Sequence, residues 1–219
     1  MTDANRNVER SAKIDTATLS DALDRLGIAG QCLGVKPLHH GFRLTGRAFT
    51  LTYGPATNEG TVGDYIDDVP VGAVIVIDNQ GREDASVWGD ILTMCAHQRG
   101  VNGTVIEGAC RDTHLAMELN YAIFSRSYSM RTGKDRVQLD RVGGIVEIGG
   151  ARILPGDIIR GDSDGMLSVP QGSEGAVLDL AEAINQAEGE IRKSVSNGAR
   201  LDEARRQYSY HLLQRREKR

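Results

Sequence analysis

Long apolar stretches are missing from this sequence of 219 residues, and cysteine, proline and aromatic residues are scarce. No apolar run is long enough to cross a bilayer, and the polar N-terminus carries no signal-peptide pattern, so we expect a cytoplasmic protein with no membrane partner. The three cysteines (Cys32, Cys95 and Cys110) lack metal-ligand spacing, and their odd number argues against a disulfide framework. A reducing compartment fits this cysteine content.

Sequence patterns that would identify a reaction directly are also absent. There is no G-x-x-x-x-G-K-[ST] phosphate loop, no G-x-G-x-x-G after a predicted strand, and no recognisable Ser/His/Asp or Cys/His set. The formal net charge of −4 argues against nucleic acid as the main partner. Because His39 and His40 have no third ligand nearby in the sequence, we interpret them as polar loop residues rather than as a metal site.

The residues that are present predict one α/β domain. With 26 glycines and 40% hydrophobic residues, the chain has many turns and enough apolar side chains for one good-sized core. Alternating or β-branched apolar runs predict strands and 3.6-residue periodicity predicts helices, so that αβ crossovers follow one another. The predicted strands lie at 47–53, 73–78, 103–106 and 122–124, and the predicted helices at 16–26, 91–99, 113–119 and 173–196.

We divide the expected domain into an α/β core over 15–170, a C-terminal helix over 173–196 and a helical basic tail over 197–219. Residues 1–14 are expected to be a polar lead-in. Short strands after residue 144, with a hairpin turn at Gly149-Gly150, are expected to form a β-rich cap. The remaining polar segments are interpreted as an acidic, solvated loop (56–70) and a basic surface excursion (126–142).

One stretch contains most of the residues that could take part in binding or catalysis. Asp90 precedes a predicted helix, and Arg111 and Asp112 follow the next predicted strand, with twenty residues between Asp90 and Arg111. Both aspartates stand where a helix is expected to begin, and free N–H groups and the positive end of the helix dipole favour anions at such a place. An arginine beside a metal-capable aspartate at a helix start suits a small carboxylate substrate.

Two interpretations of this stretch remain open on spacing alone. In the first, Asp90 and Asp112 are helix caps and Arg111 is a surface ion-pair partner; spacing favours this interpretation because caps are common. In the second, Asp112 binds a hard divalent cation, Asp90 holds one of its waters, and Arg111 meets a carboxylate or a developing oxyanion. Cys110 is expected to pack at the strand end, and His97 and His114 to have surface or supporting roles.

The same residues resemble a known family. Trp88-Gly89-Asp90, the run Gly-Thr-Val-Ile-Glu-Gly-Ala-Cys (103–110) and then Arg111-Asp112 are similar to the family that contains the regulator of ribonuclease activity A (RraA) and the 4-hydroxy-4-methyl-2-oxoglutarate aldolases. The likeness extends to 18–23, 71–78, 154–157 and 162–165. In this context the spacing of Asp90 to Arg111-Asp112 is tied to lyase activity, so the resemblance favours the second interpretation.

The resemblance implies a swivelling β/β/α fold and a class II pyruvate aldolase that also decarboxylates oxaloacetate. It implies Mg²⁺ or Mn²⁺ as cofactor, a small 2-oxo acid as substrate, and a homo-oligomer, either a trimer or a dimer of trimers, with sites between subunits. Carried over by position, the resemblance implies that Asp112 is a direct metal ligand and that Asp90 binds the metal through water. Arg111 would contact the pyruvoyl group, and the N–H groups of Ile91 and Leu92 would bind its carboxylate. A neighbouring subunit would supply Glu188, or alternatively Glu190, as a further ligand through water.

The resemblance also leaves another function open. A branch of the family consists of non-enzymatic regulators that bind and inhibit an RNA-degrading enzyme, and that branch does not keep the full metal pattern. A menaquinone methyltransferase label is attached to some members, but no nucleotide-type glycine loop is present here. Residues 58–68 and 126–142 and the tail from Leu201 depart from the family pattern, so the aldol partner is not predicted.

Overall fold

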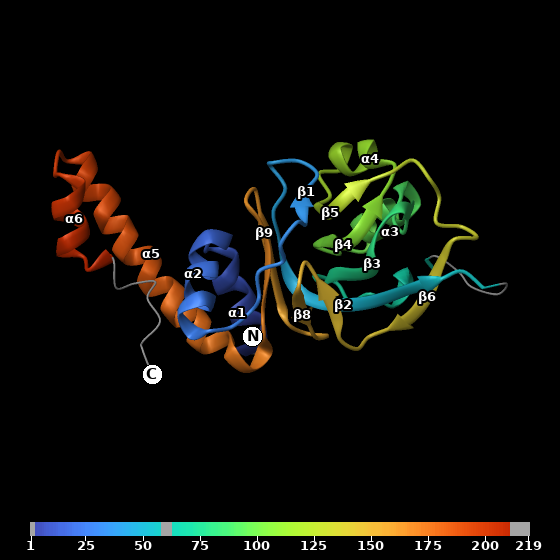
Figure 1. Ribbon diagram of the computed structural model, residues 1–219, viewed down its shortest axis with the longest axis horizontal. Helices are drawn as coiled ribbons and strands as arrows, with labels where there is room; N and C mark the ends of the chain where they lie inside the picture. Colours follow the sequence, from blue (N-terminus) through green and yellow to red (C-terminus); the bar gives the residue numbers. More distant parts are fainter. Residues whose placement is uncertain (1–2, 58–62, 211–219) are drawn as a thin grey trace.

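The computed structural model describes residues 3–57 and 63–210, and a mixed β-sheet forms its centre (Figure 1). Within these residues the strand order is β1-β5-β4-β3-β2-β9-β10, with β6 also paired to β2. Strands β2 to β5 run parallel, whereas β1, β6, β9 and β10 pair antiparallel with their neighbours. The bounds are β1 (Lys36–Pro37), β2 (Leu44–Pro55), β3 (Val74–Ser86), β4 (Gly103–Cys110), β5 (Ile123–Tyr128), β6 (Val137–Val142), β9 (Ile158–Asp162) and β10 (Gly165–Val169).

Both faces of the central strands are covered. All eight residues of β4 are buried, as is typical of a parallel strand with layers on both sides. Helices α3 (Asp90–Gln98) and α4 (Thr113–Glu118) cover one face, together with the short helix η1 (Ile66–Asp68). The hairpin of β7 (Val146–Ile148) and β8 (Ala151–Ile153) covers the other face. The fold class is therefore confirmed as mixed α/β with a central sheet and a C-terminal helix.

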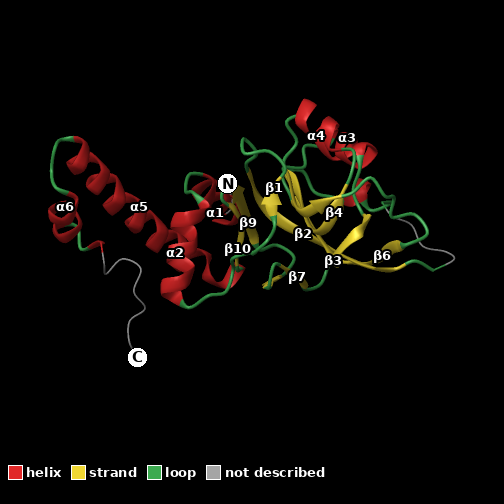
Figure 2. Cartoon of the chain, turned by 45° about the horizontal axis from the view of Figure 1, so that its top comes forward, coloured by secondary structure: helices red, strands yellow, loops and turns green. Residues whose placement is uncertain are grey.

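The remaining helices gather at the β9–β10 end of the sheet (Figure 2). Helices α1 (Asp3–Ala12), α2 (Thr16–Leu26) and α5 (Glu174–Ser196) lie there, and α2 and α5 share an apolar cluster with β9 and β10. Asp15 caps α2 by accepting from the Thr18 N–H at 2.7 Å, and Gly27 ends it at φ +71°, so the helix has the bounds predicted for it, 16–26.

The prediction of a polar lead-in over 1–14 was wrong, because α1 is a helix. Arg10 of α1 forms ion pairs with Asp179 (2.6 Å) and Glu182 (2.7 Å) of α5. Asn7 of α1 donates to the buried Glu174, which also pairs with Arg47. These partners are more than 100 residues away in the chain, so the local sequence contains no sign of them.

The strands extend further than their apolar runs. Strand β2 continues through Gly54-Pro55, past its predicted end at residue 53, because β6 pairs with that end. Strand β3 continues past Gln80 and Gly81, whose positive φ angles (57° and 68°) accompany a shift in register rather than a turn out of the sheet. Strand β4 also continues past its predicted end at residue 106 and includes Gly108-Ala109. Residues 126–142, expected to be a surface excursion, supply the end of β5 and all of β6.

The β-rich segment after residue 144 is divided between two sheets. The Gly149-Gly150 hairpin is confirmed, with both glycines at positive φ. Strands β9 and β10 instead join the main sheet through β2, so the separate cap is the β7–β8 hairpin alone. In the acidic segment 56–70, residues 58–62, with Asn58 and Glu59, lie outside the described residues. Tyr65, Ile66 and Val69 pack in the core, whereas Asp64, Asp67 and Asp68 are exposed.

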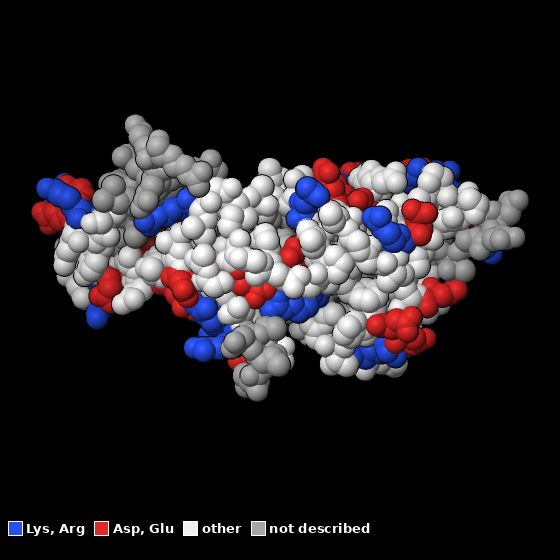
Figure 3. Space-filling model, turned by 90° about the horizontal axis from the view of Figure 1, so that it is seen from below, with Lys and Arg blue, Asp and Glu red and all other residues white. Residues whose placement is uncertain are grey.

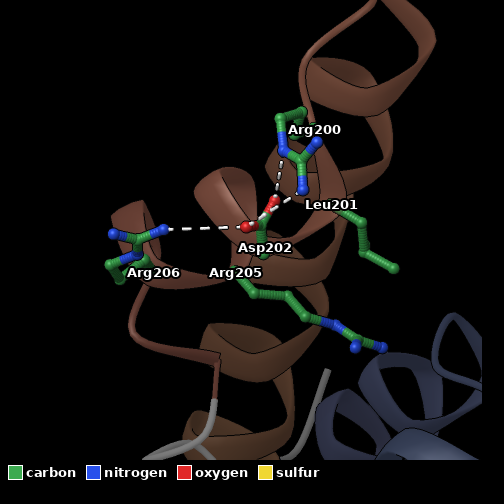
Figure 4. Close-up of a pocket in the computed structure, with 5 residues that line it drawn as sticks. All are labelled: Arg200, Leu201, Asp202, Arg205 and Arg206. Atoms are coloured by element: carbon green, nitrogen blue, oxygen red, sulfur yellow. Dashed lines mark hydrogen bonds and ion pairs between the residues drawn. The ribbon is translucent and has the colours of Figure 1, made fainter.

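Helix α5 extends away from the sheet as a long arm, and α6 (Leu201–Gln207) folds back beside it (Figure 1). The buried face of α5 includes Val177, Leu178 and Ala181, whereas Ala176 and Ala183 are exposed. At the start of α6, Asp202 pairs with Arg200 and Arg206 on the surface (Figure 4). On the face seen in Figure 3, acidic and basic side chains are interspersed. None of the described helices is both long and apolar enough to span a membrane.

Asp162 of β9 accepts hydrogen bonds from the start of α2, and its protonation should lower the free energy of unfolding at low pH. It is 4% exposed and accepts from the Thr16 N–H (2.8 Å) and hydroxyl (2.7 Å). Burial acts to raise the pKa of this carboxyl, but the bonds from Thr16 and Asp164 and the charge of Arg160 outweigh burial and lower it. A lowered native pKa stabilises the fold above the unfolded pKa, and this stabilisation is lost as the pH falls through the native pKa.

We therefore expect acid to destabilise the wild-type protein more than an Asp162→Asn variant. The free energy of unfolding should be measured by urea titration at several values between about pH 5 and about pH 2. Equal pH dependence of the two proteins would show that Asp162 does not contribute.

Candidate functional site

The predicted site lies where β3 and β4 end. The Arg111 N–H donates to the Trp88 carbonyl oxygen at 2.9 Å, and the Val87 N–H donates to Ala109 at 3.2 Å. These bonds hold the Trp88-Gly89-Asp90 segment beside the Arg111-Asp112 segment, although twenty residues separate Asp90 from Arg111. In an open α/β sheet the carboxyl ends of parallel strands are the usual place for ligands.

Trp88 makes a rigid base under this site. Its side chain is 2% exposed and stacks on Tyr121 at 6.3 Å between ring centroids. The Trp88 indole N–H donates to the Thr93 hydroxyl at 2.9 Å, and that hydroxyl donates to the Gly89 carbonyl oxygen at 2.9 Å. The start of α3 is therefore fixed both by packing and by hydrogen bonds.

Gly89 makes room for the two charged side chains that follow β4. A Cβ atom at position 89 would lie 2.9 Å from Oδ2 of Asp112 and 3.4 Å from Nε of Arg111. Those two side chains also contact one another, with 3.2 Å between Nε and Oδ2, and each is about one-third exposed. In the part of the chain that the structure describes, Asp112 is the one ion-pair partner of Arg111, so the outer nitrogens of the guanidinium remain available to a ligand.

The cap interpretation holds for the position of Asp112 but not for its side chain, and Asp90 lies one residue inside its helix. Helix α3 begins at Asp90 itself, with Gly89 as N-cap, and Asp90 Oδ1 accepts from the neighbouring Ile91 N–H at 2.8 Å. Asp112 stands before α4 but caps no N–H, and its backbone is left-handed at φ +54°. A non-glycine residue in this region costs free energy, and such residues concentrate at functional sites. The Asp112 carboxylate therefore faces Arg111 and Gly89 rather than the helix.

Of the two N–H groups predicted to bind the substrate carboxylate, one already has a hydrogen-bond partner. Ile91 N–H is already bound to Asp90 Oδ1, so a substrate carboxylate could bind it only after that side chain moves. The assignment of Leu92 N–H stays a prediction. Ile91 itself is 75% exposed and lines the cleft.

An open cleft of about 360 Å³ lies beside these residues. Its walls are residues 86–92, Arg111 and the loop residues 132–134. A volume of this size suits a small ligand. The sequence interpretation did not include Thr132, Gly133 and Lys134, because nothing in the basic segment 126–142 indicates which part of it reaches the site.

The other candidate groups near the site are structural or exposed. Burial raises the pKa of the Cys110 thiol to about 11, with the Asp112 charge acting in the same direction, so Cys110 is a packed thiol rather than a nucleophile. His97 and His114 are exposed on α3 and α4. Glu188 pairs with Arg192 on α5, at the opposite end of the molecule from α3 (Figure 1). It can therefore take part in a site only in a neighbouring copy.

The donor set that one chain provides is sparse but suits a hard cation. No group of three or more His, Cys, Asp or Glu side chains placed to hold a metal occurs within residues 3–57 and 63–210. Mg²⁺, however, usually takes one or two carboxylates and keeps several waters. Asp112, which binds no helix N–H, and Asp90 on the cleft wall fit such a cation.

Residues 16–168 match the sequence model of the RraA-like family, which is described as Aldolase/RraA. The chain belongs to this family. Protein DlpA of Legionella pneumophila is 40% identical over 200 residues, which cover 90% of this chain, but the match spans about a third (32%) of that relative's length. An inferred 4-hydroxy-4-methyl-2-oxoglutarate aldolase of Halalkalibacterium halodurans is 33% identical over 82% of this chain and 83% of its own length.

The fold agrees with that of a solved relative. The crystal structure of an uncharacterized protein from Pseudomonas syringae has a TM-score of 0.86 and 41% identity, and the match covers 92% of this chain and 97% of that one. The family's description names both aldolases and RraA proteins, so membership by itself does not choose between an enzyme and a regulator.

Proposed function

We propose that this protein is a divalent-metal-dependent carbon–carbon lyase. It would cleave 4-hydroxy-4-methyl-2-oxoglutarate, or a related 4-hydroxy-2-oxo acid, to pyruvate, and also decarboxylate oxaloacetate. The observation that carries the proposal is the contact of Arg111 with Asp112 over Gly89, at the edge of an open cleft. The name of the relative from Halalkalibacterium halodurans supports the substrate class.

Asp112 is proposed to hold Mg²⁺ or Mn²⁺ directly and Asp90 to hold it through water. Because Glu188 cannot reach the cleft of its own chain, its contribution requires a homo-oligomer, proposed to be a trimer or a pair of trimers. A cation at this place supplies a Lewis acid for the keto oxygen of the substrate.

The side chains of this chain supply the remaining steps. Arg111 directs its outer N–H groups at the keto oxygen, where cleavage of the C3–C4 bond leaves an enolate, and a fixed positive charge there stabilises it. The N-terminal end of α3 receives the neighbouring carboxylate. The carboxylate of Asp90 can hold the water that takes the proton of the 4-hydroxyl group and returns it to C3 of the enolate. The products are pyruvate and a second carbonyl compound.

Removal of the metal is expected to abolish activity. Protein stripped with a chelator should release no pyruvate above the protein-free rate from 4-hydroxy-4-methyl-2-oxoglutarate or oxaloacetate, and added Mg²⁺ or Mn²⁺ should restore release above the rate with the metal alone. Pyruvate is measured through NADH oxidation by lactate dehydrogenase, which needs no divalent metal. Undiminished release by the stripped protein would contradict the proposed cofactor.

The regulator interpretation predicts that added metal restores no activity. A protein that only binds and inhibits an RNA-degrading enzyme would release no pyruvate from any of a panel of 2-oxo acids, with or without metal. The intact Asp90, Arg111 and Asp112 set favours the lyase. Inhibition of RNA cleavage together with the lack of pyruvate release would favour the regulator.

A further inference from the structure

A second cation lines the same cleft as Arg111. Lys134 lies in the loop between β5 and β6 and belongs to the wall formed by residues 132–134. Arg111 comes from the end of β4, so the two cations reach the cleft from different elements. A substrate with one carboxylate and one keto group gives no role to a separate ammonium group.

The loop that carries Lys134 is fixed to the base of the site. The Ser86 N–H donates to the Arg131 carbonyl oxygen at 3.0 Å, and Ser86 also forms a β-bridge with Thr132. The Gly133 carbonyl oxygen accepts from the N–H groups of Arg136 and Val137, both at 2.9 Å. The Lys134 N–H donates to the Thr132 hydroxyl at 3.2 Å. The backbone at Lys134 is therefore held in place before any ligand binds, which lowers the entropic cost of binding.

The charge of Lys134 is not used within the described structure. Nearby cations have acidic partners: Arg131 lies 3.7 Å from Asp84, and Arg82 lies 3.8 Å from the same carboxylate. No acidic side chain among residues 3–57 and 63–210 forms an ion pair with Lys134. Lys134 is exposed, lines a small cleft and has no ion-pair partner among these residues, so its ammonium group can bind an anionic group of a ligand.

We propose that Lys134 binds the distal carboxylate of the substrate, so that the site selects 2-oxo dicarboxylic acids over the corresponding monocarboxylic acids. The inference rests on the proposed function, because it assumes that the 2-oxo acid end of the substrate binds beside Arg111. The distal carboxylate then lies toward residues 132–134. Lys134 acts here on selection among substrates, whereas Arg111 acts at the reacting end.

The test uses two inert ligands that differ only at the distal end. 2-Oxoglutarate and 2-oxopentanoate have the same chain length and lack the 4-hydroxyl group, so retro-aldol cleavage cannot occur. By calorimetry with Mg²⁺ present, the wild-type protein should bind 2-oxoglutarate about tenfold more tightly, which corresponds to ~1.4 kcal/mol. Lys134→Met should reduce the preference below about twofold, and Lys134→Arg should retain most of it.

A control variant separates this role from the general charge of the loop. Arg131→Met removes an exposed cation three residues away that does not line the cleft, so the preference should persist. Equal affinity of the wild-type protein for the two ligands would overturn the inference. So would a preference that survives in Lys134→Met, or one that is lost equally in Arg131→Met.

Turnover distinguishes this inference from the proposed function. Pyruvate release is compared for 4-hydroxy-4-methyl-2-oxoglutarate and 4-hydroxy-4-methyl-2-oxopentanoate, in which a methyl group replaces the distal carboxylate. Lys134→Met should lower kcat/KM about tenfold for the first substrate and less than about twofold for the second. A protein that releases no pyruvate but shows the Lys134-dependent binding preference would refute the lyase and retain the carboxylate site. Equal losses for both substrates would overturn the inference and leave the lyase intact.

Discussion

Replacement of Arg111 by alanine is expected to lower metal-dependent pyruvate release about 10²–10³-fold, mainly in kcat. The guanidinium is held by its contact with Asp112 and by the bond from the Arg111 N–H to Trp88, so it is oriented before the substrate binds. Such a preorganised charge acts on the enolate more strongly than on the ground-state ketone. Steady-state kinetics with 4-hydroxy-4-methyl-2-oxoglutarate measures the loss.

Two further variants sharpen this experiment. Arg111→Lys should recover only part of the activity, because an ammonium group has no planar fork and loses the Nε contact with Asp112. Arg152→Ala, at an exposed position on β8, should retain full activity and serves as the matched control. Near-normal turnover of Arg111→Ala with an unchanged Tm would refute the assignment of Arg111.

Gly89→Ala should inactivate the protein while leaving it folded. Gly89 has φ −155° and ψ −166°, an extended conformation open to any residue, so alanine causes no backbone strain there. The added methyl group instead lies 2.9 Å from Oδ2 of Asp112. The end of a side chain can move to relieve this contact, but the carboxylate then leaves its position beside Arg111. Because misplacement by about 1 Å can cost about 10²-fold in rate, we expect a loss of that order.

Other glycines provide the controls for this variant. Gly133→Ala would place Cβ 2.3 Å from the backbone oxygen of Ser86, so it should lower Tm together with activity. Gly175→Ala, in helix α5, meets nothing within 4 Å and should leave activity unchanged without lowering Tm, because alanine favours the helix over glycine. The informative measurements are kcat/KM and Tm of all three variants. Wild-type turnover of Gly89→Ala, or a fall in Tm as large as that of Gly133→Ala, would contradict the specific role of Gly89.

Features that depend on neighbouring residues were predictable from the sequence. The cap at Asp15, the end of α2 at Gly27 and the Gly149-Gly150 hairpin follow from local backbone preferences, and the structure has all three. The long helix over 173–196 is present as α5, because its length and periodicity are local properties too. The same reasoning predicted buried strands at 73–78 and 103–106, though shorter than β3 and β4.

Features that depend on distant partners were not predictable in this way. Strand β6 (VQLDRV) is short, with one acidic and one basic residue, and it forms a strand through its pairing with the edge of β2. The extension of β2 through Gly54-Pro55 has the same cause. Helix α1 is held by ion pairs and hydrogen bonds to α5, and a single sequence offers no indication of such contacts.

For the site, the sequence by itself determined which chemical groups are available and that Arg111 and Asp112 are adjacent. It also determined the resemblance to a family, which the match over residues 16–168 confirmed. Only the tertiary structure decided that Asp112 turns away from the helix to lie beside Arg111 over Gly89, and that Lys134 joins the same cleft. The physical reason is that contacts between distant segments bring these groups together. Strand β3 pairs with β4, and Ser86 bonds to the loop at Arg131 and Thr132.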